Sequence, residues 1–179
     1  MIKLYGEPIL RAKTRPVPRV TEQTRALVAR LEQALEDNSG LGVAAPQIGE
    51  LARVVVYDLG EGPVALINPK ITAREGEAVM EEGCLSLPNL HGEVVRALRV
   101  TVKALDEQGR SFVRQAEGLE ARVIQHECDH LEGKLFIDRV RRETLYWAVG
   151  EDENGEPYRQ PTTLESALRV FESRVRAQA

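Results

Sequence analysis

Apolar residues recur every three or four positions in three segments of the chain, and this spacing predicts three amphipathic helices. The first begins after Thr21, a residue suited to capping a helix N-terminus, and ends near Asn38-Ser39-Gly40. The second covers residues 119–131, and the third begins at Thr163. Before the first helix, several prolines predict an extended N-terminal arm, because proline disfavours helix at the residue that precedes it.

Two other stretches predict antiparallel strand pairs. Residues 53–59 and 64–70 are rich in β-branched side chains and flank a Gly60-Glu61-Gly62-Pro63 turn. Residues 98–105 alternate between apolar and polar side chains, and a Gln108-Gly109 turn leads into a return strand. The elements together predict an α+β fold, with mostly antiparallel strands packed around a central helix, plus N-terminal and C-terminal helices.

The chain length of 179 residues is that of one ordinary domain, and no internal repeat divides it. We therefore expect residues 1–179 to form a single domain. Within it, residues 141–179 are expected to form a C-terminal helical extension, with a short segment through Trp147 and a polar turn over residues 151–157 before the final helix.

Composition and charge exclude several classes of protein. A formal net charge of −4 argues against a bulk nucleic-acid-binding surface. The longest apolar runs are far too short to span a membrane, and the first residues lack the apolar stretch of a secretory signal. Two cysteines do not make a disulfide framework, so free thiols and a cytoplasmic location are expected.

The strongest chemical signal is the His-Glu-x-x-His motif of the central helix. Residues four apart lie on one helical face, so His126 and His130 can direct both imidazoles at one metal ion. Glu127 is rotated by about 100° from His126 and can lie beside the metal without binding it. A chance match is the alternative, although the motif uses two of the three histidines in the chain.

A third ligand is needed for a stable site, and the spacing leaves several candidates. Phe136 occupies the position where one class of metalloprotease carries its third histidine, so that class is excluded. Cys128 is rotated by about 200° from His126 and is expected to be a small core residue. His91 is expected on the surface or in a loop. Cys84 has the setting of a strand edge beside a turn, and spacing alone leaves it open between a ligand and a buried structural cysteine.

Three protein ligands and one open position are typical of a catalytic metal. One thiolate and two imidazoles suit Fe²⁺, Zn²⁺, Co²⁺ or Ni²⁺, and the open position would hold a water made acidic enough to attack a carbonyl. Gln47, after a glycine-marked loop, offers amide N–H donors to an oxyanion. The alternative for Gln47 is a loop side chain that faces solvent.

Three segments, taken together, resemble the peptide deformylase family. They are Gly40-Leu41-Gly42-Val43-Ala44-Ala45-Pro46-Gln47, Glu82-Gly83-Cys84-Leu85-Ser86, and Gln125-His126-Glu127-Cys128-Asp129-His130-Leu131. Each pattern is ambiguous alone, but their order and spacing are specific. The resemblance runs from the N-terminal arm to about Asp138. It implies hydrolysis of the N-formyl group from the initiator methionine of newly made polypeptides, with release of formate.

The resemblance also implies a role for each site residue. Cys84, His126 and His130 would bind Fe²⁺, with Zn²⁺ as a common replacement. Glu127 would act as general base and then as general acid toward the leaving amine. The Gln47 side chain and the backbone N–H of Leu85 would stabilise the oxyanion. Gly42 and the strand-like backbone near Glu82 would pair with the extended peptide substrate.

Some features depart from the family or stay open. Ser39 stands where family members often carry an acid, and Arg122 faces the cleft side of the helix, which leaves the side-chain preference after methionine undetermined. The final helix is either a ribosome contact or a packing helix. Its balanced charges favour packing: Arg169, Arg174 and Arg176 against Glu165 and Glu172.

Two other functions compete with the deformylase. One is a general metallopeptidase that uses the same glutamate, and the other is a non-catalytic module that binds a metal or formyl-peptides. Glu127 and Gln47 argue against the module, because binding alone needs neither. The expected partners are N-formyl-methionyl peptides of nascent chains.

Overall fold

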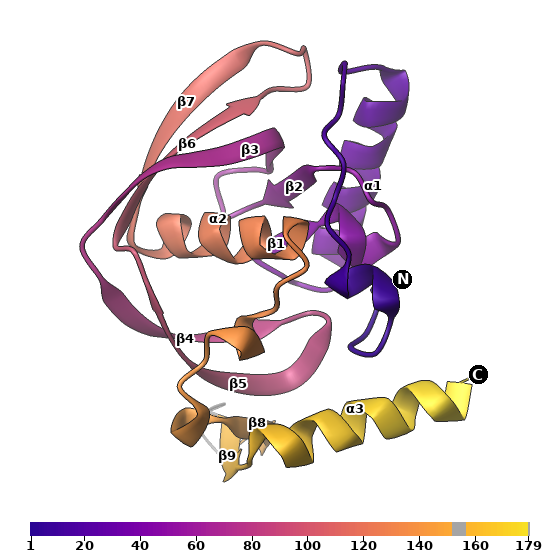
Figure 1. Cartoon of the computed structure of the whole chain (residues 1–179), viewed down its shortest axis with the longest axis vertical. Coiled ribbons are helices and arrows are strands. Elements are labelled where there is room, and N and C mark those ends of the chain that lie inside the picture. The colour runs from indigo at the N-terminus through magenta and orange to yellow at the C-terminus, as the bar shows by residue number, and fades with distance from the viewer. Residues whose placement is uncertain (152–156, 179) are drawn as a thin grey trace.

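The structure is a computed structural model that describes residues 1–151 and 157–178 (Figure 1). In these described residues, seven strands lie between the first and second of three α-helices, two more strands lie between the second and third, and short 3-10 turns lie between some of these elements. The helices and strands are α1 (Glu22–Asp37), β1 (Gly42–Ala44), β2 (Val54–Tyr57), β3 (Val64–Glu75), β4 (Ala78–Cys84), β5 (Leu87–Arg96), β6 (Arg99–Leu105), β7 (Ser111–Glu117), α2 (Gly118–Leu131), β8 (Tyr146–Glu151), β9 (Pro157–Pro161) and α3 (Leu164–Gln178).

The strands form two sheets in which neighbouring named strands pair in antiparallel fashion. One sheet has five strands in the order β1-β2-β3-β6-β7, and the other has four in the order β4-β5-β8-β9. The predicted α+β class with mostly antiparallel strands is therefore confirmed.

Both predicted strand pairs are present, and each turn is closed by an aspartate. Asp58 accepts hydrogen bonds from the backbone N–H groups of Gly60 and Gly62 between β2 and β3. Asp106 does the same for Gln108 and Arg110 between β6 and β7. These bonds satisfy backbone donors locally, which is why a short polar segment can reverse the chain at these two points.

The prediction of a helical extension over residues 141–179 is wrong for its first part. Residues 146–151 and 157–161 are strands, and β8 extends the β4–β5 hairpin through the pairs Leu90–Trp147 and His91–Tyr146. The expected polar turn falls largely on residues 152–156, which lie outside the described residues. Only α3 is helical as expected over its main span. The N-terminal arm also contains a 3-10 turn at Pro8–Arg11.

Helix α2 lies between the five-stranded sheet and the β4–β5 hairpin, as Figure 1 shows. Its side chains Ala121, Ile124 and Leu131 are fully buried against Val100 and Val102 of β6 and neighbouring residues of the sheet. Removing a side chain such as Ile124 from water contributes about 1.5–3 kcal/mol to stability. This packing fixes which face of α2 turns toward β4, and so it positions the site. Among the described residues, none of the helices has the length and apolar character needed to cross a bilayer.

Candidate metal centre and active site

Cys84, His126 and His130 meet where the end of β4 faces the last turns of α2. One ligand atom from each residue lies within 4.8 Å of the other two. The Sγ atom of Cys84 is 3.3 Å from Nε2 of His130, and the two imidazole ring centroids are 5.1 Å apart. The two histidines share one face of α2 because they are four residues apart. A thiol and two imidazoles thus converge on one point.

Local structure holds Cys84 at this point. The ladder between β4 and β5 shifts register after Glu82, and Cys84 then pairs with Leu87 across a tight turn. The N-terminal arm fixes the next residues, since the backbone N–H of Tyr5 donates to the carbonyl of Ser86. Register shifts of this kind redirect a side chain relative to a regular strand.

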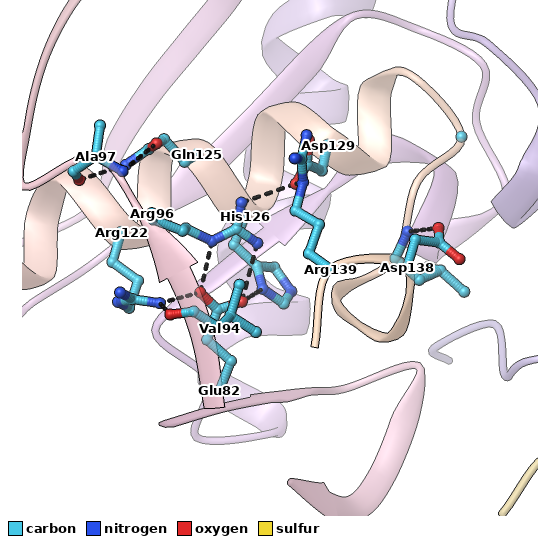
Figure 2. Close-up of polar contacts among 12 residues, drawn as sticks. Glu82, Val94, Arg96, Ala97, Arg122, Gln125, His126, Asp129, Asp138 and Arg139 are labelled. Atoms are coloured by element: carbon cyan, nitrogen blue, oxygen red, sulfur yellow. Dashed lines mark hydrogen bonds and ion pairs between the residues drawn. The ribbon is translucent and has the colours of Figure 1, made fainter. Parts of the chain in front are cut away.

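A buried network of ion pairs orients His126 by contacting the Nδ1 side of its ring (Figure 2). Oε2 of Glu82 lies 2.9 Å from Nδ1 of His126, while Oε1 of Glu82 accepts from Arg96 and Arg122. Arg96 also donates to Asp129 at 2.8 Å. Because Glu82 occupies Nδ1, the Nε2 atom of His126 is left for a ligand on the other side, as is common for metal-binding histidines.

The charge state of Glu82 follows from these contacts. Burial alone would raise the pKa of Glu82, but the hydrogen bonds from His126 and Arg96 outweigh it and hold the pKa far below its usual value. Asp129, which accepts from both Arg96 and Arg139, likewise has a lowered pKa. The network is therefore ionised at neutral pH, with each buried charge facing an opposite one.

Glu127 is the buried carboxyl group next to the three ligands. Its Oε2 atom has no hydrogen-bond partner among the described residues, and burial raises the pKa of Glu127 to about 7. Its other side packs on Gly42 of β1, where a Cβ atom would come within 2.5 Å of Oε1. An acid with a free oxygen at the ligand cluster can exchange a proton with a molecule bound there.

Gln47 is almost fully buried at 1% exposure, so the solvent-facing alternative for this residue is wrong. Its Oε1 atom accepts from the backbone N–H of Ala44 at 2.9 Å. Its Nε2 atom donates to Oγ of Ser86 at 3.2 Å and lies 3.6 Å from Sγ of Cys84. The carbonyl end is therefore fixed, and the amide N–H end points at the ligand cluster.

A cavity of about 550 Å³ opens onto this cluster. The residues that line it come from the loop before β1, from β1 and the 3-10 turn that follows it, from the β4–β5 hairpin and from α2. They include Gly42, Gln47, Glu82, Cys84, Leu85, Arg122 and Glu127. Ser39 lines it as well. Arg122 is 4% exposed and donates to Glu82 and to the carbonyl groups of Ala78 and Val94, so both terminal nitrogens of its guanidinium are engaged.

The remaining candidates fall elsewhere. Cys128 packs against the core of the five-stranded sheet and lines a separate cavity, and burial raises the pKa of its thiol to about 12. The sequence predicted a surface or loop position for His91. The residue lies in strand β5, and it lines the cleft. Sequence reasoning missed Arg96 and Asp129. The sequence did contain one sign of the network: Arg96 follows Leu90 and Val94 at the same alternating, inward positions of a strand.

The first 145 residues match the family model described as polypeptide deformylase. The chain belongs to the polypeptide deformylase family. A peptide deformylase of Halothermothrix orenii is 47% identical over 143 residues, which cover 79% of this chain and 93% of the relative. One of Desulfitobacterium hafniense is 49% identical over 137 residues, which cover 76% and 91%.

Solved structures of peptide deformylases are similar to this fold as well. The peptide deformylase of Thermotoga maritima is 41% identical, covers 78% of this chain and 96% of its own, and superposes with a TM-score of 0.77. That of Legionella pneumophila is 34% identical, covers 99% and 96%, and has a TM-score of 0.80.

As a deformylase, the chain is a hydrolase that removes the N-formyl group from newly made polypeptides. The family is metal-dependent, and this chain presents a Cys/His/His site. A general metallopeptidase and a non-catalytic binding module have no counterpart among the relatives named above.

Proposed function

We propose that Cys84, His126 and His130 hold one divalent metal ion, and that Fe²⁺ is the native ion, with Zn²⁺, Ni²⁺ or Co²⁺ as replacements. The convergence of the three ligand atoms within 4.8 Å carries this proposal. The donor set fits, because a thiolate with two imidazoles suits these ions and disfavours Mg²⁺ and Ca²⁺. The Glu82 bond to Nδ1 of His126 adds the outer support that such ligands usually have. A metal in this place supplies Lewis-acid chemistry, which acidifies water and polarises a carbonyl.

Glu127 is proposed to carry the proton through the reaction. Hydrolysis adds a water to the formyl carbon, breaks the C–N bond, and leaves formate and the free amine of the peptide. Oε2 of Glu127 takes a proton from the attacking water and returns it to the amine nitrogen as that group leaves. The support is positional: Oε2 is buried, has no partner among the described residues, and lies on the residue next to His126.

The oxygen of the formyl group gains charge as water adds, and two N–H donors are proposed to stabilise it. Nε2 of Gln47 is held near Cys84 by the bond between Ala44 and Oε1 of the same side chain. The backbone N–H of Leu85 lies in the turn directly after Cys84. Donors fixed before the reaction contribute most to such stabilisation, because they need no reorganisation.

The peptide substrate is proposed to lie extended between β1 and β4. Gly42 and Glu82 both line the cleft, one from each strand. The Glu82 side chain is committed to Arg96, Arg122 and His126, so only its backbone is available to a peptide. An extended peptide in this place would pair through its main chain, which suits an enzyme that must accept many sequences.

Three further proposals concern the whole chain. Residues 1–179 form one catalytic domain, and the protein acts in the cytoplasm, where formylated chains are made. A ribosome contact through α3 stays a prediction. Ala167 and Phe171 of α3 are buried, which supports a packing role, and the side chains of Arg174 and Arg176 lie outside the described residues.

Formate release tests the proposal. The protein, purified without oxygen and loaded in turn with Fe²⁺, Zn²⁺, Ni²⁺ or Co²⁺, is offered formyl-Met peptides beside the same peptides without the formyl group. Before loading, Fe²⁺ should be the most abundant metal in the purified protein. After loading, we expect one equivalent of bound metal and formate from the formylated peptides only. Cleavage of internal peptide bonds, or formate release from metal-free protein, would contradict it.

A further inference from the structure

Three aromatic or cationic side chains form a stack that joins the cleft to the C-terminal strands. His91 of β5 and Tyr146 of β8 are direct cross-strand neighbours, with ring centroids 5.6 Å apart and ring planes 20° from parallel. The guanidinium carbon of Arg159 in β9 lies 4.7 Å from the centre of the Tyr146 ring. Since β8 lies between β5 and β9, Tyr146 is the middle layer of this stack.

Glu81 of β4 ties the stack together. Its carboxylate accepts a hydrogen bond from the hydroxyl group of Tyr146 and pairs with Nη1 of Arg159 at 2.9 Å. Its Oε1 atom also lies 4.0 Å from Nδ1 of His91. One carboxylate therefore contacts all three layers, and side chains held by several partners lose less freedom when a ligand binds.

The His91 end of the stack faces the substrate cleft. His91 lines the cavity together with Glu81 and Gly83, and its side chain is 34% exposed. A Cβ atom on Gly83 would lie 2.8 Å from Cε1 of His91, so the ring rests directly on the backbone of β4 one residue before the ligand Cys84. Successive residues of an extended chain lie about 3.3 Å apart, so a peptide that lies along β4 with its formyl group at the ligand cluster can bring one of its next residues to His91.

We propose that His91 is a specificity-determining residue that contacts the peptide beyond its formylmethionyl residue, and that Tyr146 and Arg159 are positioning residues that hold the ring. The inference rests on the proposed binding of an extended peptide along β4. Its consequence is that part of the substrate site comes from beyond residue 145, where the match to the family model ends.

The chemistry of this wall sets a preference for the residue that follows methionine. Burial lowers the pKa of His91, so its ring is neutral at neutral pH and offers a flat aromatic surface. The carboxylate of Glu81 lies beside it. An aromatic side chain can pack on this ring and is therefore favoured, whereas an acidic one gains no cationic partner, because Arg159 is already paired with Glu81.

Steady-state formate release from three substrates tests this: formyl-Met amide, formyl-Met-Phe amide and formyl-Met-Asp amide. We expect His91→Ala to lower kcat/KM for the phenylalanine substrate about 3- to 10-fold through KM, which is the range of an aromatic contact. Formyl-Met amide should change less than twofold. Arg159→Ala should also lower kcat/KM for the phenylalanine substrate. His91→Phe, which keeps an aromatic ring at this position, should leave that kcat/KM near the wild-type value. Arg169→Ala is the control, because Arg169 is an exposed arginine on α3 outside the stack.

Wild-type protein should also prefer the phenylalanine substrate to the aspartate substrate, and His91→Ala should narrow that difference. Equal losses on all three substrates, or loss of bound metal in His91→Ala, would overturn the inference, because either result indicates a structural role. An unchanged KM for formyl-Met-Phe amide in both His91→Ala and Arg159→Ala would overturn it as well. Failure of metal-loaded wild type to release formate from formyl-Met amide would instead contradict the proposed function.

Discussion

At the scale of single residues, the contact between Gly42 and Glu127 sets the position of the proposed proton carrier. No larger residue fits at position 42 without moving the carboxylate, since even a Cβ atom would lie 2.5 Å from Oε1. We expect Glu127→Ala to lower kcat by about 10²–10⁴-fold, the usual contribution of a positioned general base. Bound metal should stay at one equivalent, because Glu127 is no ligand. Formate release and metal analysis check this, and joint loss of metal and activity would make Glu127 structural.

Gln47 permits a separate test of the oxyanion. Its amide is locked by Ala44 and Ser86, so the donor is in place before substrate arrives. Removing one such donor typically costs about 10²–10³ in kcat. Gln47→Ala should therefore reduce kcat far more than it raises KM in formate-release kinetics. A change confined to KM would show that Gln47 holds the substrate and not the transition state.

The two cysteines provide a matched pair. Cys84→Ser should empty the metal site, whereas Cys128→Ser should keep the metal, because Cys128 packs against the core and lies outside the ligand cluster. Cys128→Ser should cost about 1 kcal/mol of stability through packing. Metal quantification and denaturant unfolding of both variants check this. Retention of metal in Cys84→Ser with loss in Cys128→Ser would reverse the assignment.

At the scale of elements, periodicity predicted α1, α2 and the two strand pairs, because each presents a regular apolar face to one layer of the core. It did not predict the β4–β5 hairpin. Val79 and Met80 of β4 are exposed, while the inward positions of this hairpin include Glu82 and Arg96. Because charged residues occupy inward positions, the sequence of this hairpin does not show the alternation of apolar and polar residues that is typical of a strand. The partners of these charged residues come from another strand and from α2, and such long-range pairing cannot be read from local sequence.

The same limit applies to the site. The His-Glu-x-x-His spacing is local, so His126 and His130 could be paired from the sequence alone. Cys84 lies more than forty positions earlier in the chain, and only the family resemblance selected it from the candidates. The stack of His91, Tyr146 and Arg159 depends on strands that the sequence pattern did not reveal.

The ion network that links β4, β5 and α2 predicts a large effect from one substitution. Arg96 is 3% exposed in its side chain and bridges Glu82 to Asp129. Arg96→Leu would leave both carboxylates short of a partner, and breaking a buried pair in this way costs about 3–5 kcal/mol. Because Glu82 orients His126, metal affinity should also fall about 10–100-fold. Denaturant unfolding and metal titration check both effects.

A matched arginine on a surface pair serves as the control. Arg141 contacts Glu93 of β5 with both side chains nearly half exposed, so Arg141→Leu should cost less than about 1 kcal/mol. Equal stability losses in the two variants would contradict a special role for the buried network. An unchanged metal affinity in Arg96→Leu would show that Glu82 orients His126 without help from the arginine.

At the scale of the whole molecule, the question is whether the C-terminal strands and α3 unfold together with the rest. Phe171 of α3 is 1% exposed, and its ring lies 5.4 Å from that of Trp147 in β8 and 6.1 Å from that of Tyr5 in the N-terminal arm. The N-terminal arm and α3 therefore share one hydrophobic cluster, in which Phe171 is buried and Tyr5 and Trp147 are partly buried. If residues 1–179 are one domain, loss of this contact should destabilise all of it.

Trp147 is the only tryptophan, so its fluorescence reports on the C-terminal strands, while far-UV circular dichroism reports on the whole chain. We expect the two unfolding curves to coincide in wild type, as two-state unfolding requires. Phe171→Ala should shift both curves together by about 3–5 kcal/mol, the usual cost of a large cavity. Glu172→Ala, an exposed neighbour on the same helix, should shift neither by more than about 0.5 kcal/mol. In a single cooperative domain, the loss of any one contact lowers the stability that both probes measure. A shift of the fluorescence curve alone would therefore mean that the C-terminal part unfolds as a separate unit.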